Sequence, residues 1–519
     1  MILEDQNEVI AFLGSPETHH RASVERMETH ASIVFLAGGT AYKLKRAVRY
    51  DYLDFSTADR RRQCSEAELR INRQAAPGIY RRVVPITRDA RGGLALGGDG
   101  TPVDWVIEMT RFDQDALFDR LAARGALDLA LMRPLGAQVA AFHAQAAQRP
   151  DQGGANGMAW VIDGNAEAFR GAQALLHEAS SVGAPLISAS RAALDRHRDL
   201  LDRRRDEGFV RQCHGDLHLR NIVLFDGTPT LFDAIEFNDA LSCVDVQYDL
   251  AFLLMDLWGW RLRQHANAVF NGYLAATVDV AALAVLPLFL SCRAAIRAKT
   301  TLAAAALASD GRAQQLDTAR GYLHAAGQLL RSPRPALVAI GGVSGTGKST
   351  LARAIAPFVG PVPGAALLRT DEIRKRLCGV HELSRLGANG YTEDVSRRVY
   401  ETLAMQAADV VRAGHSAIAD AVFMNPGERA TIEKAASAVG VPFAGLWLQA
   451  PEPLLVERVN RRRADVSDAD AALVHKQLAR EPGAIAWNRL DASPDSETIR
   501  QRALHLLDSL VHGGITLAA

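Results

Sequence analysis

The sequence ALVAIGGVSGTGKSTLARAIA, at residues 336–356, predicts the fold of the C-terminal part of this chain. It contains G-x-x-x-x-G-K-[ST] in full, between an apolar run of β type and an amphipathic helical pattern. Glycines in this context let backbone N–H groups turn inward around phosphate oxygens, and the helix N-terminus adds a favourable dipole. The motif therefore predicts a P-loop that binds a nucleoside triphosphate, which we expect to be ATP, together with Mg²⁺. The residues expected at the phosphates are Gly342, Val343, Ser344, Gly345, Thr346, Gly347, Lys348, Ser349 and Thr350.

Two side chains of the motif have roles of their own. Lys348 is expected to contact the β- and γ-phosphates, and Ser349 is expected to bind Mg²⁺. Around the motif, β-type and helical patterns alternate from 336 onward, which predicts a parallel sheet flanked by helices. The segment Arg331–Pro335 is short, polar and twice broken by proline, as in a linker. We expect one domain over 1–330 and a P-loop domain over 336–519.

Further polar residues follow the strands predicted in the P-loop domain. Asp371 comes after the second strand, with Arg374 three residues later; a carboxylate there can accept a proton from a substrate hydroxyl, and an arginine can hold an anionic group. A capping aspartate with a surface arginine is the alternative interpretation. Asp420 ends another apolar strand and suits either a Mg²⁺ ligand acting through water or a plain cap.

An arginine-rich stretch lies further along the same domain. Arg458, Arg461 and Arg462 occur where a mobile lid would bring positive charge onto a transferring phosphoryl group. With the P-loop and the D-x-x-R after the second strand, residues 336–510 resemble the P-loop kinases that include gluconate kinase, chloramphenicol phosphotransferase, the kinase domain of polynucleotide kinase and zeta toxins. On that resemblance Asp371 and Arg374 are the base and the anchor for the acceptor.

A second dense cluster is CHGDLHLRNIVLFDGTPTLFDAIEFNDA, residues 213–240. Asn221 lies five residues after Asp216, and Asp233 follows twelve residues later. Phosphoryl transfer needs a carboxylate near the acceptor hydroxyl and oxygen ligands for Mg²⁺, and this spacing supplies both. The same D-x-x-x-x-N spacing occurs in the catalytic loop of protein kinases. An Asx-rich turn between strands, with no catalytic role, is the alternative interpretation.

The leading H-G-D resembles aminoglycoside phosphotransferases and related choline and fructosamine kinases, which implies a bilobal protein-kinase-like fold for residues 1–330. On that resemblance Asp216 is the catalytic base, Asn221 and Asp233 hold Mg²⁺, and Asp249 is structural. The nucleotide would meet Lys43, with Lys45 as the rival, and an ion pair would form with Glu68, with Glu66 as the rival. Glu108 and Met109 would lie near the adenine. The glycine-rich loop of protein kinases is absent from the corresponding stretch near 28–32.

Composition excludes several classes of protein. Lys+Arg and Asp+Glu both number 59, so the net charge is zero, and a nucleic-acid partner is not expected. The five cysteines are scattered without a CxxC pair, so neither a disulfide framework nor a zinc site is expected. The N-terminus lacks the pattern of a signal peptide, and the most apolar stretch, 281–290, is too short to span a bilayer. We expect a cytoplasmic protein without a membrane partner; the sequence leaves its oligomeric state open.

Almost the full length resembles a bacterial two-domain family in which an aminoglycoside phosphotransferase-like domain is fused to an ATP-binding domain. That resemblance implies an α/β and α+β chain with two ATP-dependent phosphotransferase modules and a small hydroxylated molecule as acceptor. The residues leave other hypotheses open: a nucleotide-gated regulator, or a zeta toxin-like kinase restrained by the N-terminal domain. A kinase acting on nucleic-acid ends is less favoured because the chain is neutral.

Overall fold

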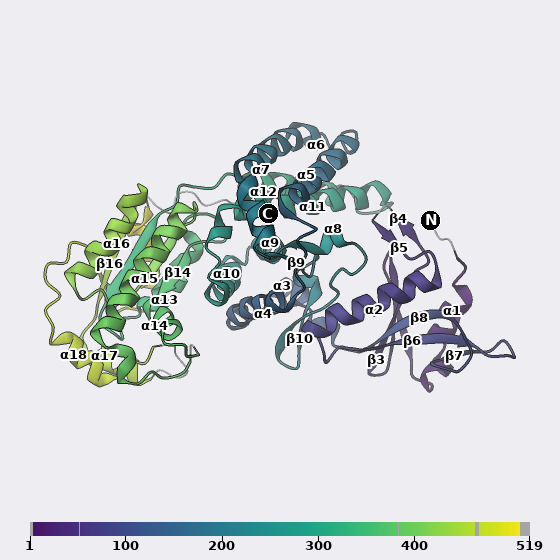
Figure 1. The fold of residues 1–519 in the computed structure, drawn as a ribbon, viewed down its shortest axis with the longest axis horizontal. Helices are drawn as coiled ribbons and strands as arrows, with labels where there is room; N and C mark the ends of the chain where they lie inside the picture. Colours follow the sequence, from purple (N-terminus) through teal and green to yellow (C-terminus); the bar gives the residue numbers. More distant parts are fainter. Residues whose placement is uncertain (1–3, 51, 382, 462–466, 509–519) are drawn as a thin grey trace. The chain divides into compact units, whose positions relative to one another are not determined.

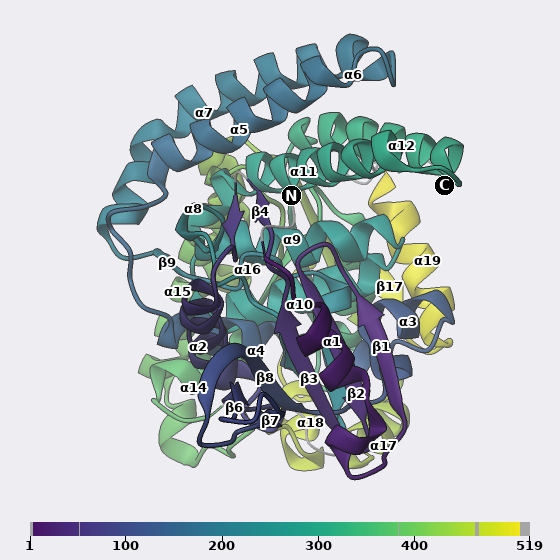
Figure 2. The same cartoon turned by 90° about the vertical axis from the view of Figure 1, so that its right-hand side faces the viewer.

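The computed structural model describes residues 4–50, 52–381, 383–461 and 467–508. These residues pack into two compact units, and Figures 1 and 2 show the chain from two directions. Unit 1 comprises the described parts of Met1–Leu131, Ala141–Met158 and Arg198–Asp256. Unit 2 comprises those of Met132–Ala140, Ala159–His197 and Leu257–Ala519. The expected linker at 331–335 lies inside unit 2, and a domain division at that linker remains a prediction.

Unit 1 contains a six-stranded sheet in the order β1-β2-β3-β8-β6-β7, in which all neighbours are antiparallel. A turn at Gly38–Gly39 joins β2 to β3, and the two strands pair Ile33 with Leu44. One face is apolar and packs under helix α1. The bounds are α1 Asn7–Gly14, β1 Val24–Glu28, β2 Ser32–Ala37, β3 Thr40–Lys45, β6 Tyr80–Arg88, β7 Leu94–Leu96 and β8 Thr101–Thr110.

Helix α2, Ala58–Ala75, lies across this sheet (Figure 1). It begins where the Thr57 side chain accepts a hydrogen bond from the Arg60 N–H, one of the four donors that a helix start leaves unpaired. Its buried stripe is largely polar, with Arg61 and Glu68 fully buried seven residues apart on one face. Arg61 donates two hydrogen bonds to Asp104 of β8, at 2.8 and 2.9 Å. Helix α2 is therefore fixed to the sheet by charge pairing as well as by apolar contact.

Two short antiparallel strand pairs in unit 1 carry the second sequence cluster. Strand β9 pairs with β12, and β10 pairs with β11, both antiparallel. The segment 213–221 connects β9 to β10, and Asp233 follows β11, so these two strand pairings bring the cluster's ends together. The remaining bounds in unit 1 are β4 Arg49–Tyr50, β5 Leu53–Asp54, α3 Phe118–Ala123, β9 Val210–Gln212, β10 Ile222–Phe225, β11 Thr228–Leu231, α8 Asp239–Ser242 and β12 Cys243–Asp245. Four helices have residues in both units: α4 Met132–Gln145, α5 Gly154–Gly171, α7 Gly183–Asp206 and α9 Val246–Gly259.

Unit 2 contains a five-stranded parallel sheet in the order β14-β15-β13-β16-β17. Its central strand β13 is buried along its whole length, as expected for a strand covered on both faces. The alternation in the sequence predicts four of these strands; β17 reads NRLD and is mostly exposed, so no apolar run marks it. The bounds are β13 Leu337–Gly342, β14 Ala366–Arg369, β15 Ala417–Asp420, β16 Phe443–Gln449 and β17 Asn488–Asp491.

Helices cover both faces of this sheet (Figure 1). Helix α13 starts at Lys348, directly after the P-loop, and packs with α19. Helices α15 and α16 pack against each other, and α17 packs with α18. The bounds are α13 Lys348–Ile355, α14 Thr370–Leu377, α15 Glu393–Arg412, α16 Pro426–Val439, α17 Glu452–Asn460, α18 Ala471–Leu478 and α19 Ser496–Leu506.

The rest of unit 2 is helical. Helices α11 and α12 run side by side (Figure 2). Helix α10 packs beside β14, where buried Asn271 accepts a hydrogen bond from the Leu367 N–H at 2.7 Å. The bounds are α6 Glu178–Ser181, α10 Arg263–Thr277, α11 Leu286–Leu307 and α12 Arg312–Leu330. Among the described residues, no helix combines the length and apolarity that crossing a membrane requires.

Candidate functional site

The P-loop connects β13 to α13 in a backbone conformation that only glycine adopts readily. Gly342 and Gly345 have φ angles of +136° and +90°. A Cβ at Gly342 would lie 2.5 Å from the Leu448 carbonyl oxygen, and one at Gly345 would lie 2.7 Å from that of Leu455. The Lys348 ammonium donates to the Val343 carbonyl at 3.2 Å, which closes the loop. This cradle fits the triphosphate that the motif predicts.

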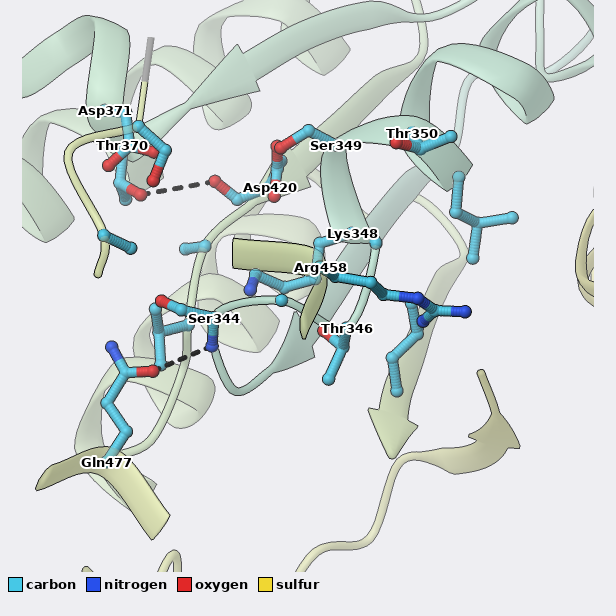
Figure 3. A pocket seen from close by; sticks show the side chains of 18 of the residues that line it. Ser344, Thr346, Lys348, Ser349, Thr350, Thr370, Asp371, Asp420, Arg458 and Gln477 are labelled. Carbon is cyan, nitrogen blue, oxygen red and sulfur yellow. Dashed lines mark hydrogen bonds between the residues drawn. The ribbon is translucent and has the colours of Figure 1, made fainter. Parts of the chain in front are cut away.

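A pocket with a volume of about 480 Å³ opens over this loop (Figure 3). Asp371, Arg374, Asp420 and Arg458 line it together with the loop, so the structure brings these predicted residues together. Other lining residues carry no recognisable signal in the sequence, because they come from distant loops and helices. They include Tyr391, Tyr400, Gln477, Pro494, Ser496 and Ile499.

The predicted magnesium ligands Ser349 and Asp420 lie at one side of this pocket. The Ser349 hydroxyl donates to the Asp420 carboxylate. Arg369, at the end of β14, donates to Asp420 Oδ2 at 3.2 Å and to Ser349 Oγ at 3.1 Å. Its guanidinium also meets Glu372 at 3.2 Å. A hydroxyl and a carboxylate in contact suit Mg²⁺, which prefers oxygen ligands. Sequence reasoning missed Arg369, since nothing local distinguishes it from any residue at a strand end.

Asp371 is the predicted proton acceptor, and its surroundings favour that role. Burial raises the pKa of its carboxyl, and the charge of Asp420 raises it further, whereas Arg369 and Lys348 oppose the change. Arg374 donates to the Gly390 carbonyl at 2.8 Å, and its guanidinium lies 4.9 Å from the centre of the Tyr391 ring. Arg374 therefore helps to shape the wall of the pocket beside Asp371.

The predicted lid arginines are placed differently from one another. Arg458 lines the pocket and donates to the Ala492 carbonyl at 2.9 Å. Arg461 is exposed and pairs with Glu457 at 2.7 Å, on its own helix. Arg462 lies outside the described residues. A contact between a lid arginine and a phosphoryl group therefore stays a prediction.

The second candidate site, in unit 1, centres on a buried ion-pair cluster. Lys43 Nζ lies 2.7 Å from Glu68 Oε1 and also pairs with Asp233. Lys45, two residues along the same face of β3, lies 2.6 Å from Glu68 Oε2 and also pairs with Glu236. Both rival lysines thus reach Glu68, but Lys43 alone of the two pairs with the predicted metal ligand. The rival Glu66 is exposed on α2.

The charges in this cluster control the acidity of its members. Burial raises the pKa of Glu68, but the two ammonium groups outweigh that effect and lower it to about 2. Burial also raises the pKa of Glu236, and the charge of Glu68 adds to this, so that it reaches about 7 despite Lys45. Sequence reasoning did not single out Glu236, because only the three-dimensional structure reveals its partner on β3.

The segment 213–221 places Asp216 beside the predicted metal ligand Asn221. The Asn221 amide donates to the Asp216 carboxylate at 3.1 Å and to its carbonyl at 2.9 Å. A ring nitrogen of His218 lies 3.2 Å from the same carboxylate. Asp233 has a φ of 62°, and its N–H donates to the Tyr80 hydroxyl at 3.1 Å. The predicted base and both predicted metal ligands are thereby held by specific hydrogen bonds.

Asp249 holds the start of the segment 213–221 in place. Its carboxylate accepts hydrogen bonds from the N–H groups of His214 and Gly215, at 3.1 and 2.8 Å. It also meets His143 at 3.0 Å. The position agrees with the structural role that the resemblance implies. Burial lowers the pKa of His214, whose ring contacts the Phe232 carbonyl, so a bland hydrogen-bonding role suits this histidine.

Two predicted contacts near the adenine lie on opposite faces of β8. Met109 pairs with Ala41 and is buried on the face that carries Lys43. Glu108 pairs with Tyr42 on the other face, where it meets Arg82 at 2.9 Å. The structure therefore does not bring the Glu108 carboxylate to Lys43, since neighbouring residues of a strand point in opposite directions.

Two protein families match this chain, one in each of the regions that carry the candidate sites. Residues 55–285 match the phosphotransferase enzyme family, and residues 337–482 match the AAA domain. The chain thus combines a phosphotransferase-family domain with a P-loop kinase-like domain, as the motifs predict. Its fold class is the mixed α/β arrangement expected for that combination.

Individual relatives cover one or both parts. An uncharacterised protein of Mycobacterium tuberculosis is 29% identical over 505 residues, covering 94% of this chain and 96% of that protein. An adenylyl-sulfate kinase of Myxococcus xanthus is 30% identical over 117 residues, covering 22% of this chain and 59% of that protein. A structure of a choline/ethanolamine kinase family protein from Mesorhizobium loti is 14% identical and covers 63% of this chain and 95% of its own, with a TM-score of 0.38.

Proposed function

We propose that this chain, which joins a phosphotransferase-family domain to a P-loop kinase-like domain, is an ATP- and Mg²⁺-dependent phosphotransferase with two transfer sites. Each site would move the γ-phosphoryl group of ATP to a hydroxyl of a small molecule. The observation that carries the proposal is the Lys43–Glu68–Asp233 arrangement. It joins a phosphate-binding lysine, its ion-pair partner and a metal-binding carboxylate beside the Asp216–Asn221 pair.

In the unit 1 site, each group has a separate task. Asp216, oriented by Asn221 and His218, accepts the proton of the acceptor hydroxyl. Lys43 meets the phosphates, and Glu68 keeps its ammonium directed toward them. Asn221 and Asp233 would hold Mg²⁺, which neutralises charge on the phosphates when bound. Phosphoryl transfer depends mostly on such positioning and charge.

In the P-loop site, the loop N–H groups and Lys348 hold the phosphates, and Ser349 and Asp420 would hold Mg²⁺. Asp371 accepts the proton of the acceptor hydroxyl. Its raised pKa makes it a stronger base than an ordinary aspartate, because a base is most effective when its pKa approaches the working pH. Arg374 and Tyr391 form the wall of the pocket on the side where the acceptor would bind.

The experiment is a metabolite screen with γ-labelled ATP on the full chain and two variants, Asp216→Ala and Lys348→Ala. Each variant should abolish label transfer from one site and leave the other site's product. Asp310→Ala and Lys434→Ala, at exposed positions, serve as matched controls and should transfer label like the wild type.

Three results would count against the proposal. If neither variant changes turnover on an identified acceptor, the two-site phosphotransferase is wrong. If both sites bind ATP but no acceptor is labelled, a nucleotide-gated regulator explains the chain better. Growth arrest on expression of residues 336–519 alone would favour a restrained toxin-like kinase.

A further inference from the structure

Gln477 of α18 reaches the P-loop and occupies one of its backbone donors. Its side-chain oxygen accepts a hydrogen bond from the Ser344 N–H at 2.8 Å (Figure 3). Ser344 is the third residue of the G-x-x-x-x-G-K-[ST] motif, and it is 7% exposed. The bond joins residues 133 positions apart, so tertiary packing brings Gln477 to the loop.

A second contact fixes α18 at this position. Val474, one helical turn before Gln477 on the same face, is fully buried with Leu455 and Val459 of α17. Val343, next to Ser344 in the P-loop, packs against this apolar group. Two successive residues of the P-loop therefore meet this part of the structure: Val343 packs against the apolar group of α17 and α18, and the Ser344 N–H donates to Gln477.

The position of Ser344 indicates which phosphate its N–H faces. Ser344 and Gln477 line the same pocket as Asp371 and Asp420, and Ser467, in the segment that leads into α18, shares a side-chain hydrogen bond with Asp371. Asp371 and Asp420 mark the side of the acceptor and the metal. The donor nucleotide must direct its terminal phosphate toward that side, since transfer needs donor and acceptor in contact.

We propose that Gln477 is a terminal-phosphate contact that lets the P-loop site distinguish a nucleoside triphosphate from a diphosphate; this inference rests on the proposed function. A carboxamide has both an acceptor and a donor. Its oxygen engages the Ser344 N–H in this structure, and a phosphate oxygen takes that N–H when a triphosphate binds. The Gln477 amide then turns its NH₂ group to the same phosphate, so the residue exchanges one hydrogen bond for another.

The test compares two nucleotides on one variant, Gln477→Glu. Glutamate has the same length and still accepts from the Ser344 N–H, but it has no donor and carries a negative charge beside the terminal phosphate. We expect the affinity for a non-hydrolysable ATP analogue to fall about tenfold or more, because a lost charge-assisted bond and a like-charge contact exceed 1.4 kcal/mol. The affinity for ADP should change by less than about threefold.

All measurements use calorimetry on the full chain carrying Lys43→Met, which silences the unit 1 site, with Mg²⁺ present. Gln501→Glu makes the same change at an exposed position on α19 and should leave the ratio of the two affinities unaltered. Thermal unfolding of each variant reports its folding. The inference would be overturned if Gln477→Glu lowered the affinities for the ATP analogue and for ADP equally, or lowered neither.

The parent variant distinguishes a failure of the proposed function from a failure of the role of Gln477. If the Lys43→Met parent binds neither nucleotide, the proposed function of the P-loop site is wrong. If the parent binds both and Gln477→Glu keeps the same preference, only the role of Gln477 is wrong, and the bond to Ser344 serves packing alone.

Discussion

Arg369 Nε and Asp420 Oδ2 lie 3.2 Å apart, so a buried cation of the protein contacts a carboxylate assigned to Mg²⁺. The same guanidinium meets Ser349 and Glu372. Arg369 is 5% exposed, and both carboxylates are also buried. Leaving a buried carboxylate without a cation is costly, which explains why an arginine lies where the sequence alone indicates only a strand end.

We expect Arg369→Met to destabilise the folded chain by about 3 kcal/mol, because it leaves Asp420 and Glu372 without this cation. Mg²⁺ with ATP should restore more stability to the variant than to the wild type, since the metal supplies the missing positive charge. Denaturant unfolding with and without Mg²⁺ and ATP measures both effects. Arg398→Met, at an exposed position on α15, is the matched control. An equal response to the ligands in variant and wild type would contradict this role.

Lys45→Met is expected to cost about 3–5 kcal/mol of folding stability, because Glu68 and Glu236 both lose a buried partner. Lys43→Met should cost less, since its partner Asp233 is 46% exposed and can be hydrated. In the label-transfer assay we expect the opposite order of effects: Lys43→Met abolishes the product of the unit 1 site and is more damaging than Lys45→Met. Chemical denaturation and label transfer, measured on the same two variants, separate the effect on folding stability from the effect on catalysis.

A second substitution tests the cause of that loss. In Lys45→Met with Glu236→Gln, the uncompensated charge of Glu236 is absent, so about half of the lost stability should return. No recovery in the double variant would mean that packing of the Lys45 side chain, rather than charge, accounts for the loss.

These clusters also show what the sequence can and cannot predict. The P-loop and the D-x-x-x-x-N segment are local patterns whose chemistry depends on spacing, and both identify their sites. Lys43 and Lys45 cannot be separated in this way, because residues two apart on a strand share a face. Their difference lies in contacts with Asp233 and Glu236, about 190 residues away.

Gln477 and β17 illustrate two further limits. Gln477 belongs to an ordinary helical pattern, and its bond to Ser344 depends on how α17 and α18 pack against the loop. The edge strand β17 has one buried residue, Leu490, so it gives neither an apolar run nor clear alternation. Contacts between distant residues and edge strands therefore cannot be predicted from this sequence, whereas local motifs can.

His415 is expected to make the protein sensitive to acid. Its ring contacts the Gly364 carbonyl at 2.9 Å, and burial lowers its pKa to about 4, below the ordinary value of 6.5. The stabilisation from a neutral His415 is therefore complete above pH 6.5 and is lost as the pH falls toward 4, by up to about 3 kcal/mol. His415→Gln does not titrate, so its unfolding free energy should fall less between pH 7 and pH 4.5.

Denaturant unfolding at several pH values checks this, with His324→Gln as the control at an exposed position on α12. The control should follow the wild type throughout. A His415→Gln profile parallel to the wild type would show that other groups cause the acid sensitivity.

The two inner glycines of the P-loop differ in what surrounds them, although their φ angles are nearly equal. Gly345 and Gly347 have φ angles of +90° and +88°. A Cβ at Gly345 would meet the Leu455 carbonyl of α17 at 2.7 Å, whereas one at Gly347 would meet nothing within 4 Å. An alanine at either position adds backbone strain of about 1 kcal/mol or more, but only at Gly345 must α17 also move.

We therefore expect Gly345→Ala to lose about 2 kcal/mol more folding stability than Gly347→Ala, measured by denaturant unfolding without nucleotide. Displacement of α17 should also disturb Val474 and thereby the contact of Gln477 with Ser344. Hydrogen exchange of the Ser344 N–H should then become faster in Gly345→Ala and stay slow in Gly347→Ala. Equal stability and equal exchange in the two variants would show that α17 does not constrain the loop.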